Sequence, residues 1–103
     1  MLYREKQIAT NLIRSALARG WSVSVFDGIE QDGDLVVCRS TDFNQIFDSL
    51  DTTDGDTLIF SRDGKDIGEV WLIWGNADDL ISNSSDGLDF DDDGRIVPEA
   101  VAA

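Results

Sequence analysis

The spacing of the apolar residues changes from a helical to a strand period twice along the chain, and this order constrains the fold more than any other feature. Near the N-terminus apolar side chains recur every three or four residues, as on one face of a helix. From Trp21 to Val25 they alternate with serines, as in a half-buried strand. The expected helices are residues 2–19 and 42–50, and the expected strands are residues 21–25, 35–39, 57–60 and 67–74.

Helix–strand–strand, repeated once, predicts an α+β fold in which two helices cover one face of a four-stranded, mainly antiparallel sheet. Thr41 is the expected N-cap of the second helix. Asp63-Gly64 is expected to close a tight hairpin, because both residues tolerate positive φ angles. The 103 residues suit one domain. We expect a compact domain over residues 1–82 and an acidic, flexible tail over residues 83–103.

The fourth expected strand carries apolar side chains on both faces. Val70, Leu72 and Trp74 share one face, while Ile67, Trp71 and Ile73 share the other. A sheet with helices on one side is expected to have one polar face. The Trp71 face is therefore either covered by the first helix or the tail, or forms an interface with a partner or a second copy.

Two scarce residue types limit the chemistry available to this chain. It has no histidine and a single cysteine, Cys38, which we expect to be buried and reduced. This composition excludes histidine acid–base catalysis, Ser-His and Cys-His nucleophile pairs, and zinc sites built on cysteine clusters or histidine. We expect a binding protein without catalytic residues or a cofactor. No apolar run resembles a signal peptide or a membrane span, so we expect a cytoplasmic protein.

The negative charge is concentrated in one part of the sequence. Residues 1–41 hold five acids and five bases, whereas residues 42–103 hold sixteen acids and three bases and so carry the whole net charge of −13. Such a chain repels nucleic acid and anionic lipid, and it attracts basic protein surfaces or cations. A rigid edge of carboxylates presents a field similar to that of the DNA backbone.

We therefore expect an acidic partner-binding face and an apolar anchor at Trp71 or Trp74. The acids expected on this face are Asp42, Asp48, Asp51, Asp54, Asp56, Asp63, Asp66, Asp78, Asp79 and Asp86.

A second acidic motif offers a different function. Residues 89–96 match the first eight positions of an EF-hand loop, with Asp89, Asp91 and Asp93 at the first three ligand positions. The twelfth position is Ala100 in place of the bidentate glutamate. A weak calcium site at these three aspartates is one alternative function, and a structural dimer or adaptor built on the Trp71 face is another.

Four segments between residues 21 and 76 resemble small proteins encoded by bacterial phages and plasmids. These segments are Ser24-Val25-Phe26-Asp27-Gly28, Arg39-Ser40-Thr41-Asp42, Asp56-Thr57-Leu58 and Trp74-Gly75-Asn76. Mobile-element proteins of this kind include anti-CRISPR and anti-restriction inhibitors. The resemblance implies an inhibitor that occupies the nucleic-acid site of a basic host protein or nucleoprotein complex, and it assigns no function to any single residue.

Overall fold

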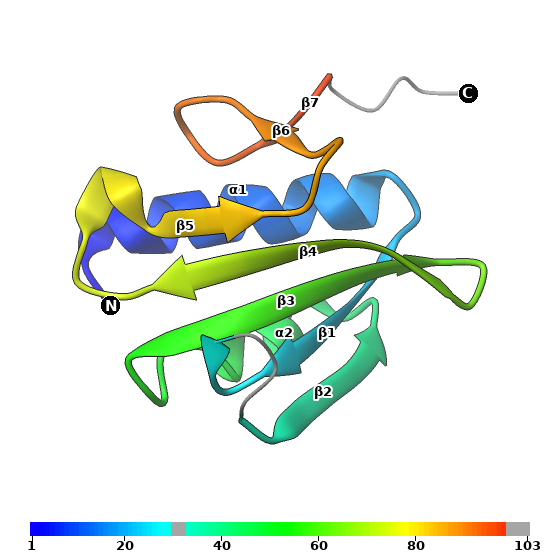
Figure 1. Ribbon diagram of the computed structural model, residues 1–103, viewed down its shortest axis with the longest axis horizontal. Coiled ribbons are helices and arrows are strands. Elements are labelled where there is room, and N and C mark those ends of the chain that lie inside the picture. Colours follow the sequence, from blue (N-terminus) through cyan, green and yellow to red (C-terminus); the bar gives the residue numbers. More distant parts are fainter. Residues whose placement is uncertain (30–32, 99–103) are drawn as a thin grey trace.

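The computed structural model describes residues 1–29 and 33–98 (Figure 1). Two α-helices, a short 3₁₀ helix and seven strands follow one another in this part of the chain. In order they are α1 (Tyr3–Ala18), β1 (Ser22–Phe26), β2 (Leu35–Ser40), α2 (Phe43–Asp48), β3 (Gly55–Arg62), β4 (Lys65–Ile73), η2 (Ala77–Asp79), β5 (Ile81–Ser84), β6 (Asp89–Phe90) and β7 (Ile96–Val97). None of the helices within the described ranges combines the length and the apolar character needed to cross a membrane.

The main sheet has five strands in the order β2-β1-β3-β4-β5, and every neighbouring pair is antiparallel. Both α-helices lie on one face of this sheet (Figure 1). The predicted α+β class and antiparallel sheet are therefore confirmed. The predicted number of four strands is wrong, because β5 adds a fifth strand and β6 pairs with β7 in a separate small sheet.

The core lies between the sheet and the two helices. Ala9, Leu12 and Ala16 of α1 are buried, as the helical spacing predicts. On the sheet, Leu58 and Phe60 of β3 are fully buried in the same cluster. Burying each large aliphatic or aromatic side chain contributes about 1.5–3 kcal/mol, so this layer supplies most of the stabilisation of the fold.

Local side-chain and backbone preferences determine the β3–β4 turn and the start of α2. Asp63 and Gly64 have φ angles of 52° and 79° in the β3–β4 hairpin, which confirms the prediction for this turn. The predicted N-cap of α2 is wrong by one residue. Asp42 is the N-cap, and its carboxylate accepts hydrogen bonds from the backbone N–H groups of Asn44 (3.0 Å) and Gln45 (3.4 Å).

The sequence predicts a flexible tail from residue 83, whereas the structure packs residues 83–98 against the domain. β5 is almost entirely polar, so it lacks the alternation that marks a strand, and it is held by backbone pairing with β4. Beyond it, the β6–β7 hairpin lies along α1 (Figure 1), and Ile96 is 2% exposed there. Residues 99–103 of the expected tail lie outside the described residues.

Cys38 is exposed, in contrast to the burial expected from its apolar neighbours. β2 is an edge strand, and its register with β1 shifts on both sides of the Val25–Val37 pair. These shifts are β-bulges, and Arg39 adopts a φ of 47° within one of them. As a result only Val37 and Ser40 of β2 point into the protein, and Cys38 points out.

Candidate functional site

The strand directions bring three connections together at one end of the sheet. β3 runs opposite to both β1 and β4, so the end of β1, the start of β3 and the end of β4 lie side by side. The connections here are β1–β2 (residues 27–34), α2–β3 (residues 49–54) and β4–β5 (residues 74–80). Figure 1 shows β4 and β1 ending where β3 begins, with η2 nearby.

We call this region the acidic end, because the described residues of its three connections include six aspartates and no lysine or arginine. Asp34, Asp54 and Asp79 are exposed, and none of the three forms an ion pair with another described residue. Two others are paired: Asp78 with Arg4 at 2.6 Å, and Asp51 with the Met1 amino group at 2.5 Å. The six aspartates are Asp27, Asp34, Asp51, Asp54, Asp78 and Asp79.

Not all of the predicted acidic face gathers at this end. Asp48, at the end of α2, joins the acidic end and is exposed. Asp42, Asp63 and Asp66 lie at the opposite end, and the eight residues of β3, about 26 Å, separate Asp54 from Asp63. Asp86 follows the end of β5 and is likewise remote from Asp54.

The opposite end of the sheet is electrically mixed. Arg62 and Lys65 flank the turn that contains Asp63. Arg39 forms an ion pair with Asp66 at 3.4 Å. Arg19 is the C-cap residue of α1. The two ends of the sheet therefore differ in charge, because arginine and lysine accompany the aspartates at the opposite end, whereas the described residues of the three connections at the acidic end include neither.

Asp56 was expected at the surface but is fully buried beneath the acidic end. Its Oδ2 accepts hydrogen bonds from the backbone N–H of Asp51 (2.9 Å) and from the indole Nε1 of Trp74 (2.7 Å). Its Oδ1 is buried without a hydrogen-bond partner among the described residues. Burial, helped by the charges of Asp51 and Asp27, raises the pKa of Asp56 despite these two hydrogen bonds.

Because its side chain is buried, Asp56 is not available to contact a partner. Trp74, proposed as an anchor, is partly buried against the core. Its indole N–H, the only polar group of the side chain, donates a hydrogen bond to Asp56.

Trp71 lies on the face of the sheet away from the helices and is half-buried. Its partner on β3, Thr57, donates a hydrogen bond of 2.7 Å to the backbone carbonyl of Gly28. A Cβ added to Gly55 would meet the side chain of Ile29 at 2.7 Å. The segment 27–29 thus covers part of this face, a role that the sequence assigned to the first helix or the tail.

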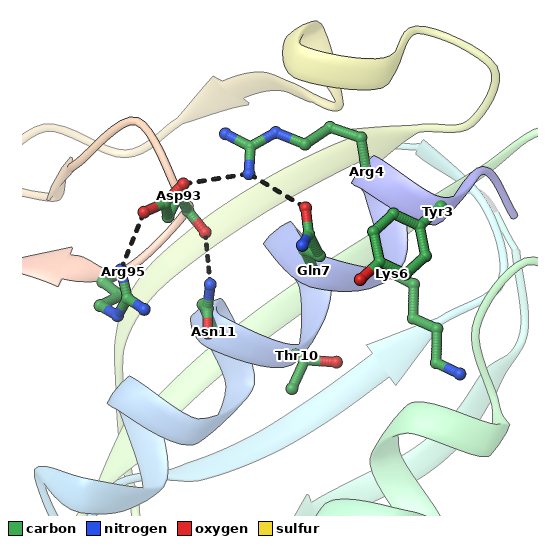
Figure 2. Close-up of a pocket in the computed structure, with 8 residues that line it drawn as sticks. All are labelled: Tyr3, Arg4, Lys6, Gln7, Thr10, Asn11, Asp93 and Arg95. Carbon is green, nitrogen blue, oxygen red and sulfur yellow. Dashed lines mark hydrogen bonds and ion pairs between the residues drawn. The ribbon is translucent and has the colours of Figure 1, made fainter.

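The acidic loop of residues 91–95 is stabilised internally and by arginines (Figure 2). Asp91 Oδ1 accepts hydrogen bonds of 2.9 Å from the backbone N–H groups of Asp93 and Arg95. Asp93 pairs with Arg4 at 3.0 Å and with Arg95 at 3.1 Å. These hydrogen bonds from Arg4 and Arg95 lower the pKa of Asp93.

Asp89 lies on β6, outside this loop. Throughout residues 1–29 and 33–98, no three metal-ligating side chains lie close enough to hold a metal ion. The arrangement gives no support to the calcium site considered for Asp89, Asp91 and Asp93.

A polar stripe on α1, made by Arg4, Asn11 and Ser15, holds the β6–β7 hairpin in place. Asn11 Nδ2 donates a hydrogen bond of 3.0 Å to the carbonyl of Asp93, and Ser15 Oγ accepts one of 3.1 Å from the N–H of Ile96. Arg4 reaches the carbonyl of Asp92 as well as the Asp93 carboxylate. Arg4, Asn11 and Ser15 are seven and four residues apart, so they lie on one face of the helix. This spacing is the feature of the sequence that could have indicated a second face of α1 in contact with the rest of the protein.

A pocket of about 440 Å³ lies beside this stripe (Figure 2). Arg4 and Arg95 contribute cations to it, and both engage Asp93. Lys6 is the remaining cation and is exposed. The pocket is lined by Tyr3, Arg4, Lys6, Gln7, Thr10, Asn11, Asp93 and Arg95.

Glu5 is the second buried carboxylate, and nothing in the sequence analysis singled it out. It is fully buried, and its Oε2 accepts hydrogen bonds from the backbone N–H groups of Gly75 (2.6 Å), Asn76 (2.9 Å) and Ala77 (3.3 Å). Burial acts to raise the pKa of Glu5. The three hydrogen bonds and a fourth from the backbone N–H of Leu2 have the larger combined effect, so the pKa of Glu5 is lowered. Glu5 thereby positions the connection that carries Asp78 and Asp79.

Comparisons with protein-family models, with curated proteins and with solved structures found no match. The resemblance to phage and plasmid inhibitors therefore stays a prediction.

Proposed function

We propose that this protein binds a basic surface of a host nucleic-acid-binding protein or complex and blocks the access of nucleic acid to it. The acidic end of the sheet supports this proposal, because the described residues of three adjacent connections there include six aspartates and no lysine or arginine. The mixed charge at the other end argues against a uniform acidic coat that serves solubility alone.

The acidic end suits a target that normally binds phosphates. Duplex DNA carries one negative charge per about 1.7 Å of its axis, so a basic groove evolved for DNA attracts a dense row of carboxylates. Aspartate side chains are short, which fixes their charges close to the backbone. Two buried carboxylates further order the backbone here, since Glu5 holds residues 75–77 and Asp56 holds the N–H of Asp51.

Capture from a bacterial lysate tests the proposal. Tagged full-length protein is incubated with nuclease-treated lysate, washed with increasing NaCl, and the bound proteins are identified by mass spectrometry. We expect a nucleic-acid-binding protein that is released by salt and, separately, by competing duplex DNA at constant ionic strength. A wash with an uncharged sugar of equal osmolarity is the control and should release nothing. A bound protein that resists both salt and DNA would contradict the proposal.

A further inference from the structure

An exposed apolar patch lies on β2, next to the acidic end. Leu35 and Val36 are 48% and 45% exposed, which is unusual for large aliphatic side chains in a strand. Leu35 also borders a hollow of about 190 Å³ on the face of the sheet away from the helices. Phe26, Cys38 and Ile59 line this hollow with it. We call Phe26, Leu35, Val36, Cys38 and Ile59 the β2 patch.

The bulges of β2 determine how the β2 patch can be used. They leave Leu35, Val36 and Cys38 pointing outward, and Arg39 has a positive φ at the far end of the strand. A bulged edge cannot offer a regular row of backbone donors and acceptors to an added strand. A partner is therefore expected to engage the side chains of the patch and not to extend the sheet.

Acidic side chains flank the β2 patch at both ends. Asp34 precedes Leu35 and is exposed, and its N–H donates a hydrogen bond of 2.6 Å to Asp27. At the other end Asp66 and Arg39 both line the hollow, 3.4 Å apart, and the Asp66 side chain is 64% exposed. The patch is continuous with the acidic end, because Phe26 and Leu35 directly adjoin Asp27 and Asp34, and the backbone N–H of Asp27 donates a hydrogen bond of 3.1 Å to the carbonyl of Asp34.

We infer that the β2 patch docks a basic amphipathic segment of the protein partner, in which cationic side chains flank one or two large apolar side chains. The inference rests on the proposed function and deepens it, since it makes the partner's surface apolar as well as basic. An apolar side chain enters the hollow beside Leu35, and the flanking cations meet Asp34 and Asp66. Protein interfaces commonly combine such an apolar centre with a charged rim.

Three acetylated, amidated peptides test this inference: Arg-Leu-Arg-Leu-Arg, Arg-Gly-Arg-Gly-Arg and Glu-Leu-Glu-Leu-Glu. Each is titrated into ¹⁵N-labelled full-length protein, and amide chemical shifts give both the affinity and the location. We expect the arginine–leucine peptide to bind about tenfold more tightly than the arginine–glycine peptide, with shifts centred on residues 35–39. The glutamate peptide should not bind, because Asp34 and Asp66 repel it.

Leu35→Ser should remove this tenfold preference without changing the binding of the arginine–glycine peptide. Leu2→Ser is the matched control, because Leu2 is also 48% exposed and lies on another element. The Leu2→Ser variant should keep the tenfold preference for the arginine–leucine peptide.

Equal binding of both arginine peptides would overturn the inference while leaving the proposed function standing. No binding of either arginine peptide would count against both. Self-association of the protein that Leu35→Ser abolishes would show that a second copy occupies the patch, which also overturns the inference.

Discussion

Glu5, in the first turn of α1, accepts a hydrogen bond of 2.9 Å from the backbone N–H of Asn76, which is 71 residues away in sequence. The same carboxylate oxygen also receives the N–H groups on either side of Asn76. The start of the helix is thereby tied to the connection between β4 and β5. The positions of Asp78 and Asp79, the surface aspartates of that connection, therefore depend on the buried carboxylate of Glu5 in α1.

Glu5→Gln should destabilise the protein by about 3 kcal/mol at pH 7, because an amide retains one acceptor oxygen and places an NH₂ group where the other oxygen accepted hydrogen bonds. The pKa of Glu5 is lowered on folding, so its contribution is present above the pKa of an unfolded glutamate and is lost as the pH falls through the folded pKa. The difference between variant and wild type in urea unfolding should therefore shrink below pH 4. A difference that is constant with pH would contradict a role for the ionised carboxylate.

Asp56→Asn should have the opposite pH dependence. The pKa of Asp56 is raised on folding, so the folded state binds its proton more tightly and loses stability as the pH rises through the folded pKa. Asparagine keeps an oxygen to accept from Trp74 and carries no charge. The variant should thus gain stability relative to wild type between pH 4 and pH 7, as measured by thermal melts. A relative loss over this range would show that the buried charge is stabilising.

Gly94→Ala should release the β6–β7 hairpin from α1. A Cβ at residue 94 would lie 2.6 Å from the Ile8 side chain and 2.8 Å from its carbonyl oxygen, so the helix backbone itself obstructs the methyl group. We expect a loss of about 2 kcal/mol in the free energy of unfolding. Gly87→Ala is the control for backbone strain, since Gly87 has a φ of 90° against 87° for Gly94 and open space around it. Equal losses in both variants would rule out the close approach to Ile8 as the cause.

Arg4→Met should loosen the same hairpin by a different route. Arg4 links Asp78 to Asp93, and its pKa is raised by those hydrogen bonds. Methionine keeps much of the apolar stem and removes the charge. Because these groups are partly exposed, the expected loss in the free energy of unfolding is small. Hydrogen exchange at the amides of Gly94 and Ile96 should become faster, whereas Lys6→Met should leave it unchanged.

The helices and strands whose apolar side chains recur at a regular spacing were predictable from the sequence. Both helices and the first four strands lie within a few residues of their expected positions, because each buries a regular stripe of side chains. β5 and the β6–β7 hairpin were missed because backbone pairing with β4 and polar contacts with α1 hold them.

The acidic end was only partly predictable, because it depends on strand order. Aspartates in turns were correctly expected to be mainly at the surface, but which turns meet is decided by strand directions that no local pattern reveals. Asp56 did carry a readable signal: it alternates with Leu58 and Phe60 and so falls on the core face of β3. Trp74 directly follows β4, two residues after the buried Leu72, and its indole N–H donates a hydrogen bond to Asp56.

The most direct test of the central claim is to neutralise charge at each end of the sheet and compare capture of the basic partner. Asp54→Asn with Asp79→Asn removes two exposed charges from the acidic end, and Asp63→Asn with Asp86→Asn removes two exposed charges elsewhere. At 0.15 M salt, where charges interact over only about 8 Å, we predict that the first pair weakens binding about tenfold and the second by less than twofold. Equal weakening by both pairs would show that net charge alone governs binding and would contradict a localised acidic site.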